Sequence, residues 1–261
     1  MARLLSLMER ERVLNRFRAG GIHLAISIAV ASLVAVLVFM VWYPTPLSLA
    51  SGVYDIFILI LIVDVVLGPL ITLVIFDPHK KELRRDLMIV AILQVSALLY
   101  GLHTVYIARP AYIVFVKDRF DLVFANDLSE KALSEVRQSD YRTLPVWGPK
   151  LVAAQLPENI EERNEVMFSS VSGGPDLQHF PKYYVPYSDL KNEVTNRLQP
   201  LDQLIELNKD KAASVDSLIS KYSSEQRMVG YFPLKGRTQD LSVVVDQATG
   251  KVLEMVDLKP W

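Results

Sequence analysis

Three long stretches almost free of charge fill most of the first 107 residues and limit the folds open to this chain more than any other feature. Residues 19–54 contain no Asp, Glu, Lys or Arg, residues 56–76 contain only Asp64, and residues 87–108 contain none. Each stretch exceeds the roughly 18 apolar residues that indicate a membrane-spanning helix. The sequence therefore predicts three transmembrane α-helices, at residues 22–43, 53–76 and 87–107.

The first stretch has an alternative interpretation as a cleaved signal peptide, because residues 48–50 have the small-x-small pattern of a cleavage site. The apolar core of a signal peptide is only about 7–15 residues long, and this stretch is much longer. Pro44 and Pro46 end the predicted helix, because proline lacks the backbone N–H and clashes with the preceding turn. We therefore interpret residues 22–43 as a retained span.

Basic residues indicate which ends of the spans face the cytoplasm. They gather in an N-terminal arm, residues 1–21, and in the turn of residues 77–86, whereas the turn of residues 44–52 has no charge. The positive-inside rule then places the arm and the second turn in the cytoplasm. The residues that set this topology are Arg10, Arg12, Arg16, Arg18, Lys80, Lys81, Arg84 and Arg85. Two interpretations of the arm stay open: an amphipathic helix on anionic lipid, or a solvated segment that only sets topology.

The remaining residues, 108–261, have an ordinary composition and enough length for a core of their own. They carry 19 Lys and Arg against 22 Asp and Glu, which argues against a nucleic-acid partner. Strand and helix patterns predict a hairpin, then helices, then strands, which is typical of an α+β domain. The expected strands are 111–116, 120–125, 228–233, 241–246 and 252–258, the expected helices are 129–138, 159–167, 201–207 and 212–221, and residues 180–187 are expected to be an extended surface segment.

The fold class that follows is a membrane protein with three N-terminal transmembrane α-helices and a soluble α+β extracytoplasmic domain. Its expected domains are the arm at 1–21, the three-span domain at 22–107 and the outer domain at 108–261.

Side chains that would support catalysis are scarce. The chain has no cysteine, which excludes disulfides, Cys-based zinc sites and thiol nucleophiles. Its four histidines, His23, His79, His103 and His179, lack metal-ligand spacing. Neither a nucleophile elbow nor a Walker loop nor a nucleotide-binding glycine fingerprint is found. We therefore expect no catalytic residue, cofactor or metal, and no small-molecule substrate is evident from the sequence.

Asp64 is the most unusual residue, because it falls near the middle of the second span. An ionised carboxylate at that depth costs about 2.5–3.5 kcal/mol. Gly68 and Pro69 follow shortly after it, and Pro69 has no N–H for the carbonyl of Val65. Acid and freed carbonyl together predict a polar notch within the bilayer.

Depth matching suggests which residues meet the notch. Gln94 and Ser96 lie at the level of Asp64 in the third span, and Ser32 lies near the centre of the first. Three interpretations stay open: a hydrogen bond that holds the three helices together, a docking point for a partner's membrane helix, or a proton or ion pathway. At the outer boundary, we expect an interfacial pair among Asp55, His103 and Arg109.

Several segments resemble the TfpX/TfpZ-type family of type IV pilin accessory proteins. The resemblance is strongest over residues 42–128 and is carried by WYP with PL at residues 42–47, DVVLGPLITLVIFDP at 64–78, Lys80-Lys81, ARPAYIVFVKDRFDLVFANDL at 108–128, and the ending LKPW.

This resemblance implies a multi-pass protein of the bacterial inner membrane with a periplasmic domain. It implies a non-enzymatic accessory factor that supports assembly or surface display of a type IV pilin through contact with pilin or the pilus machinery, with membrane lipid as its other partner. Pilins in general are held in that membrane by an apolar N-terminal helix before assembly. The alternatives are an extracytoplasmic sensor or signalling subunit, and a membrane enzyme or transporter component that uses Asp64.

Overall fold

The computed structural model describes residues 2–261, with the side chains of residues 10–138 and 140–261. The side chains of the first half of the predicted basic arm therefore lie outside the described residues. The chain folds into two compact units. One, called the helical unit below, contains the residues up to Met40 and residues 53–106, and the other, called the sheet unit, contains Val41–Gly52 and Ile107–Trp261.

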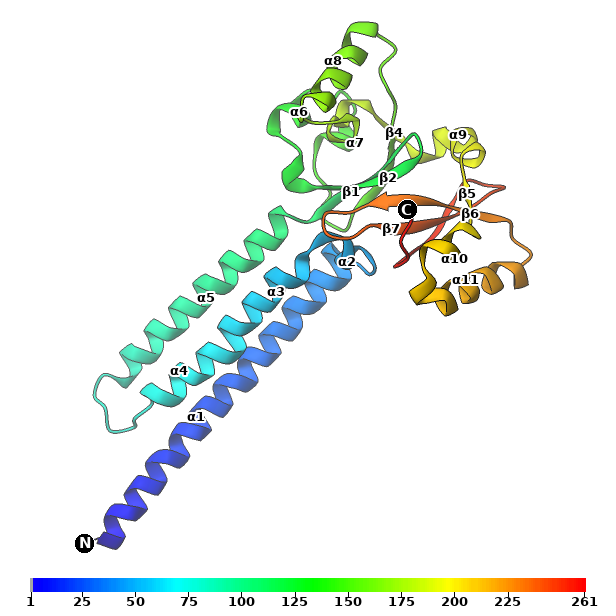
Figure 1. The fold of residues 1–261 in the computed structure, drawn as a ribbon. Helices are drawn as coiled ribbons and strands as arrows, with labels where there is room; N and C mark the ends of the chain where they lie inside the picture. The colour runs from blue at the N-terminus through cyan, green and yellow to red at the C-terminus, as the bar shows by residue number, and fades with distance from the viewer. Residues whose placement is uncertain (1) are drawn as a thin grey trace. The chain divides into compact units, whose positions relative to one another are not determined.

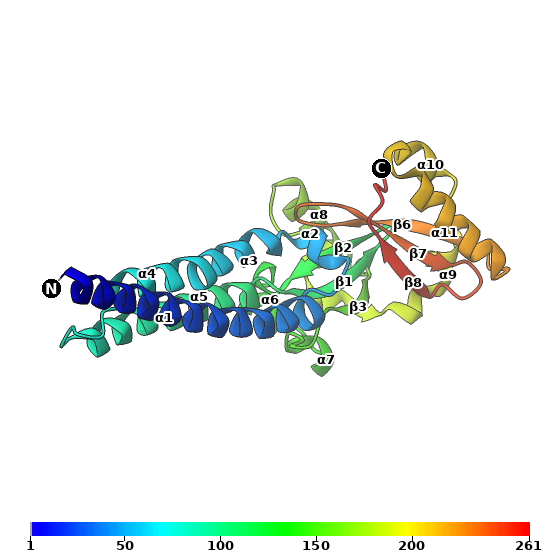
Figure 2. The same ribbon diagram turned by 90° about the horizontal axis from the view of Figure 1, so that it is seen from below.

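The helical unit consists of three long rods that run side by side (Figure 1, Figure 2). The first rod is α1 (Ala2–Val36) continued by the π-helical segment η1 (Leu37–Trp42), the second joins α3 (Val53–Leu61), the π-helical η2 (Ile62–Leu67) and α4 (Gly68–Ile75), and the third is α5 (Leu83–Ile107). Their segments Arg10–Trp42, Val53–Ile75 and Leu83–Ile107 are long and apolar enough to cross a membrane, by length and composition. The prediction of three such helices is confirmed, and their insertion into a membrane stays a prediction.

Two glycines lie where α5 packs against the second rod. A Cβ on Gly101 of α5 would lie 2.6 Å from Cγ1 of Ile60 in α3, and one on Gly68 would lie 1.8 Å from Nε2 of Gln94 in α5. Small residues at such crossings let helices pack without large side chains between them. Both contacts therefore bring α5 against the second rod.

The sheet unit is built on one curled sheet of eight strands in the described part of the chain. The strand order is β4-β3-β1-β2-β6-β7-β8, and β5 pairs with β6. Strands β1 and β3 are parallel, as are β2 and β6, and the other pairs are antiparallel. The strands are β1 (Pro110–Val116), β2 (Arg119–Phe124), β3 (Lys150–Ala154), β4 (Tyr184–Pro186), β5 (Gln199–Pro200), β6 (Val229–Lys235), β7 (Leu241–Asp246) and β8 (Val252–Val256).

Strand β1 is buried on both faces, which explains its unbroken run of β-branched and aromatic residues. Ile113 and Phe115 pack on one face with Phe120 and Phe232, whereas Tyr112 and Val114 belong to a separate cluster. Successive side chains of a strand point to opposite faces, so a central strand that is covered on both sides needs apolar residues at every position.

Short helices cover the sheet. They are α6 (Glu130–Ser134), α7 (Ser139–Arg142), α8 (Ile160–Val171), α9 (Lys191–Asn196), α10 (Gln203–Leu207) and α11 (Ala212–Ser224). Ser129 caps α6 by accepting a hydrogen bond from the N–H of Ala132, and Asn159 caps α8. The α+β class, the expected hairpin of β1 and β2, and the expected C-terminal strands are confirmed.

Two local predictions for this unit are wrong, and one strand was not predicted. The helix expected at 129–138 ends at Ser134, because the chain turns there and buries Val136 in the core. The segment 180–187 is not an extended surface segment, since Tyr184 is buried and begins strand β4. Strand β3 was not expected, because the run of Leu151 and Val152 is short.

The connection between the first two rods folds with the sheet unit. It contains a short helix, α2 (Leu47–Ser51), whose residues Leu47 and Ala50 belong to the same core cluster as Phe115. The backbone N–H groups of Arg237 and Thr238 both donate to the carbonyl of Ala50, at 2.7 and 3.1 Å. A segment that the sequence predicts only as a turn is therefore part of the sheet unit's core.

Candidate functional site

The predicted notch lies in the π-helical segment η2. The N–H of Gly68 donates to the carbonyl of Val63, five residues earlier, so the hydrogen-bond register here is that of a π-helix. In this register the donor to the carbonyl of Asp64 would be residue 69, which is proline and has no N–H. Nε2 of Gln94 in α5 approaches this carbonyl at 3.4 Å and replaces the missing donor. In an α-helical register, which the sequence predicted, the freed carbonyl would be that of Val65.

The carboxylate of Asp64 is buried against a small cavity within the helical unit. Only 8% of Asp64 is exposed, and the cavity has a volume of about 200 Å³. Its polar lining comes from Asp64, His23, Ser27 and Gln94, and the rest of the lining is apolar: Ile26, Val30, Ala91, Val95 and Leu98. All three rods therefore contribute to one polar spot surrounded by apolar side chains, the arrangement expected of a hydrogen-bonding site inside a membrane.

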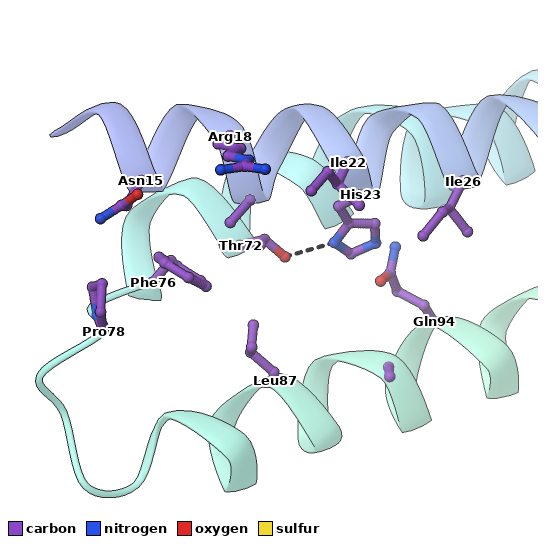
Figure 3. A pocket seen from close by; sticks show the side chains of 12 residues that line it. Asn15, Arg18, Ile22, His23, Ile26, Thr72, Phe76, Pro78, Leu87 and Gln94 are labelled. Atoms are coloured by element: carbon purple, nitrogen blue, oxygen red, sulfur yellow. Dashed lines mark hydrogen bonds between the residues drawn. The ribbon is translucent and has the colours of Figure 1, made fainter. Parts of the chain in front are cut away.

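His23 belongs to this site although the sequence analysis treated it only as a scattered histidine. Its Nδ1 lies 2.6 Å from Oγ1 of Thr72 in α4, and its ring faces the amide of Gln94 (Figure 3). Residues four apart share a face of a helix. The spacing of His23 and Ser27, two polar residues on one face of a largely apolar span, is the signal that could have identified the site.

Of the predicted partners of Asp64, Gln94 lies at the notch and the serines do not line its cavity. Ser96 is exposed on α5. The hydroxyl of Ser32 donates to the carbonyl of Ile28 within its own helix, at 2.8 Å. Gly68 matters through its missing side chain, because any Cβ would collide with the amide of Gln94.

The three residues predicted to pair at the outer boundary lie in different surroundings. Asp55 in the first turn of α3 and His103 near the end of α5 are exposed, and neither forms an ion pair within the described residues. Arg109 is 4% exposed in the sheet unit, where its Nε donates to the carbonyl of Pro145 at 3.1 Å. Their predicted pairing stays a prediction.

Four of the eight basic residues predicted to set the topology make contacts that the structure describes. Nε of Arg12 lies 3.7 Å from the carboxylate of Asp77, and Nε of Arg16 donates to the carbonyl of Phe76 at 2.8 Å. The backbone N–H of His79 and the guanidinium of Arg12 hold the pKa of Asp77 below its usual range. In the next turn, Lys80 pairs with Asp86 and Arg85 with Glu82. The contacts of Arg12 and Arg16 connect the first part of α1 with the end of α4.

No group of three or more His, Asp or Glu side chains converges as metal ligands in the part of the chain that the structure describes.

Comparisons with known proteins identify relatives of this chain. A family model described as fimbrial assembly protein FimB matches residues 11–52. The chain is 32% identical over 246 residues to the fimbrial assembly protein, serogroup I, of Dichelobacter nodosus, which covers 92% of this chain and 94% of the relative. This chain belongs to the fimbrial assembly protein family.

Two further members come from the same organism. The serogroup E1 protein is 31% identical over 246 residues, again 92% of this chain and 94% of the relative. The protein of serogroups C1 and C2 is 37% identical over 123 residues, which are 46% of this chain and 94% of that relative. No solved structure matches the chain. The region that the family model matches includes His23 and Ser27 of α1.

Proposed function

We propose that this chain is a non-enzymatic accessory factor for pilus assembly, anchored in the bacterial inner membrane by its three long helices. The observation that carries the proposal is the match to fimbrial assembly proteins along nearly the whole chain. In this proposal the N-terminus is cytoplasmic and the sheet unit is periplasmic, as the positions of the basic residues predict. The finer assignment to TfpX/TfpZ-type factors, with a cognate type IV pilin as partner, belongs to the same proposal.

The proposed point of contact within the membrane is the notch around Asp64. Before assembly, a pilin is held in the membrane by an apolar helix. A polar group on such a helix has no water to hydrogen-bond with inside the lipid. The carboxylate of Asp64 and the imidazole of His23 offer such a group a partner within the hydrocarbon. One hydrogen bond between membrane helices contributes about 0.6–2 kcal/mol. A contact of this strength is reversible, which suits a factor that must release pilin into a fibre.

A cross-linking experiment tests this contact. A photoreactive residue at Val30, which lines the cavity, reports the proximity of pilin in intact cells. We expect Asp64→Asn to lower the yield of pilin cross-links roughly three- to thirtyfold, the factor equivalent to one interhelical hydrogen bond. Surface pili should decrease in parallel.

The matched control is Asp55→Asn, since Asp55 is an exposed acid on the same rod. Immunoblots of membrane fractions confirm that both variants accumulate equally. If Asp64→Asn changes neither cross-linking nor surface pili at a normal protein level, the acid only holds the helices together. If deletion of the whole chain leaves pili unchanged, the assembly function itself is excluded.

A further inference from the structure

A second and larger groove lies beside the notch, toward the start of α1 (Figure 3). It has a volume of about 700 Å³ and lies between α1, α4 and α5. Asn15, Arg18, Ile22 and Ile26 form its wall on α1, at the spacing of one helix face. The opposite wall on α5 includes Leu87 and Ala91.

The polar side chains at the mouth of this groove are Asn15 and Arg18. Arg18 is the last charged residue before the charge-free stretch of residues 19–54, so in a membrane it lies at headgroup level. It is exposed and makes no ion pair with any residue whose side chain is described, whereas Arg12 pairs with Asp77 and Arg16 donates to the carbonyl of Phe76. A free guanidinium at this position favours an anion, and its planar geometry suits phosphate oxygens.

Beyond Arg18 the groove walls become apolar. Ile22 and Ile26 follow at one and two turns along α1, and Leu87, Ala91 and Phe76 face them from the other rods. The polar groups at the far end already have partners, because Nδ1 of His23 contacts Thr72 and the amide of Gln94 contacts the carbonyl of Asp64. The groove therefore combines a cationic mouth with an apolar interior.

The volume of the groove limits its occupant. It lies within the range of about 300–1,000 Å³ that is typical of sites for small ligands. A groove of this size with a cationic mouth and an apolar interior suits a ligand that carries an anionic head and an apolar chain.

We propose that this groove binds one anionic phospholipid, with the phosphate at Arg18 and Asn15 and an acyl chain between Ile22 and Leu87. The inference rests on the proposed membrane insertion and is independent of contact with pilin. A bound lipid fills the gap between α1 and α5 directly beside the notch, so it stabilises the positions of His23 and Gln94.

Native mass spectrometry of the full-length protein in detergent tests the proposal. Phosphatidylglycerol is titrated against phosphatidylcholine, which has no net charge. We expect the unaltered chain to retain one phosphatidylglycerol in preference, and Arg18→Gln to weaken that binding roughly tenfold, because one charge-assisted contact is lost. Ala91→Phe should weaken the binding of both lipids by filling the groove.

Arg84→Gln is the matched control. Arg84 is an exposed arginine in the first turn of α5, it does not line the groove, and its replacement changes the net charge by the same amount. We expect its binding of phosphatidylglycerol to equal that of the unaltered chain. Three results would each overturn the proposal. The two lipids bind equally, the losses in Arg18→Gln and Arg84→Gln are equal, or a pilin segment occupies the groove in place of lipid.

Discussion

The helical unit and the sheet unit use the same kinds of apolar side chain in opposite ways. In the helical unit large apolar residues face outward, as Leu33 with 73% and Val74 with 68% exposure show. In the sheet unit Phe115 and Phe232 are fully buried.

This difference supports the proposal that the two units face different solvents, the helical unit lipid and the sheet unit water. Soluble proteins rarely expose apolar patches larger than a few hundred Å², and the outward faces of all three rods are apolar along most of their length. Hydrocarbon is the solvent in which such a surface costs nothing, and in which a buried acid becomes a place for specific contacts. The predictions below test this contrast, beginning with the largest effect.

Phe115→Ala should destabilise the sheet unit most. Phe115 is fully buried among Phe120, Tyr187 and Phe232, and removal of such a ring costs about 3–5 kcal/mol. Urea unfolding of the full-length protein in detergent, followed by near-ultraviolet circular dichroism, measures the loss. Phe168→Ala is the control, because Phe168 is 71% exposed in the same unit and its removal should change stability by less than about 0.5 kcal/mol. Equal effects would contradict a water-excluding core here.

Leu33→Asp should impair the helical unit although Leu33 is exposed. A charge at this position in a span costs about 2.5–3.5 kcal/mol in lipid and almost nothing in water. We expect less protein in carbonate-washed membranes, measured by immunoblot. Val171→Asp provides the comparison, since Val171 is similarly exposed on α8 of the sheet unit and should tolerate the charge. If both variants behave alike, the two surfaces face the same solvent.

Gly68→Ala should have a moderate effect on the helical unit. The new Cβ would displace the amide of Gln94 and break its hydrogen bond to the carbonyl of Asp64, which costs about 1–2 kcal/mol. Thermal unfolding in detergent measures the change. Gly21→Ala is the control, because no atom lies within 4 Å of its Cβ position and alanine favours a helix. A stable Gly68→Ala variant with intact pili would show that this close contact is unimportant.

The smallest effect concerns a surface ion pair of the sheet unit. Nζ of Lys182 donates to the carboxylate of Glu135 at 2.9 Å, and this hydrogen bond lowers the pKa of Glu135. The pair is therefore present above the usual carboxyl pKa, and its contribution is lost as the pH falls through the lowered value. Water screens such pairs, so we expect only about 0.2–1 kcal/mol.

Titration of the Glu135 carboxyl carbon by nuclear magnetic resonance measures this shift. In Lys182→Gln the pKa of Glu135 should return toward its usual range. An unchanged value would show that the pair does not form in solution.

Elements marked by a long run of apolar residues were predictable from the sequence. The three rods follow from uninterrupted apolar stretches, and β1 follows from a run that suits a strand buried on both faces. Helix α2 was missed because its five residues carry no periodic signal, and its place depends on hydrogen bonds to residues 237 and 238, nearly two hundred positions later. Contacts at such sequence distance leave no local pattern.

The sequence predicted at which level of the helices the residues of the candidate site lie, but not which side chains face the site. Gln94 and Ser96 both lie at the level of Asp64. Residues two positions apart on a helix point in directions that differ by about 200°, so only one of the two faces the notch. The π-helical register at η2 moved the freed carbonyl from Val65 to Asp64. His23 was overlooked because the sequence analysis compared histidines only with each other.

Cysteine labelling tests the central claim most directly, because the chain contains no cysteine of its own. Single cysteines replace three exposed residues: Val171 in the sheet unit, Leu93 on α5 and Arg84 at its start. A membrane-impermeant maleimide is added to spheroplasts before and after permeabilisation. We expect immediate labelling at position 171, labelling at 84 only after permeabilisation, and none at 93. Rapid labelling at 93, or labelling at 84 but not 171 in sealed spheroplasts, would contradict the account.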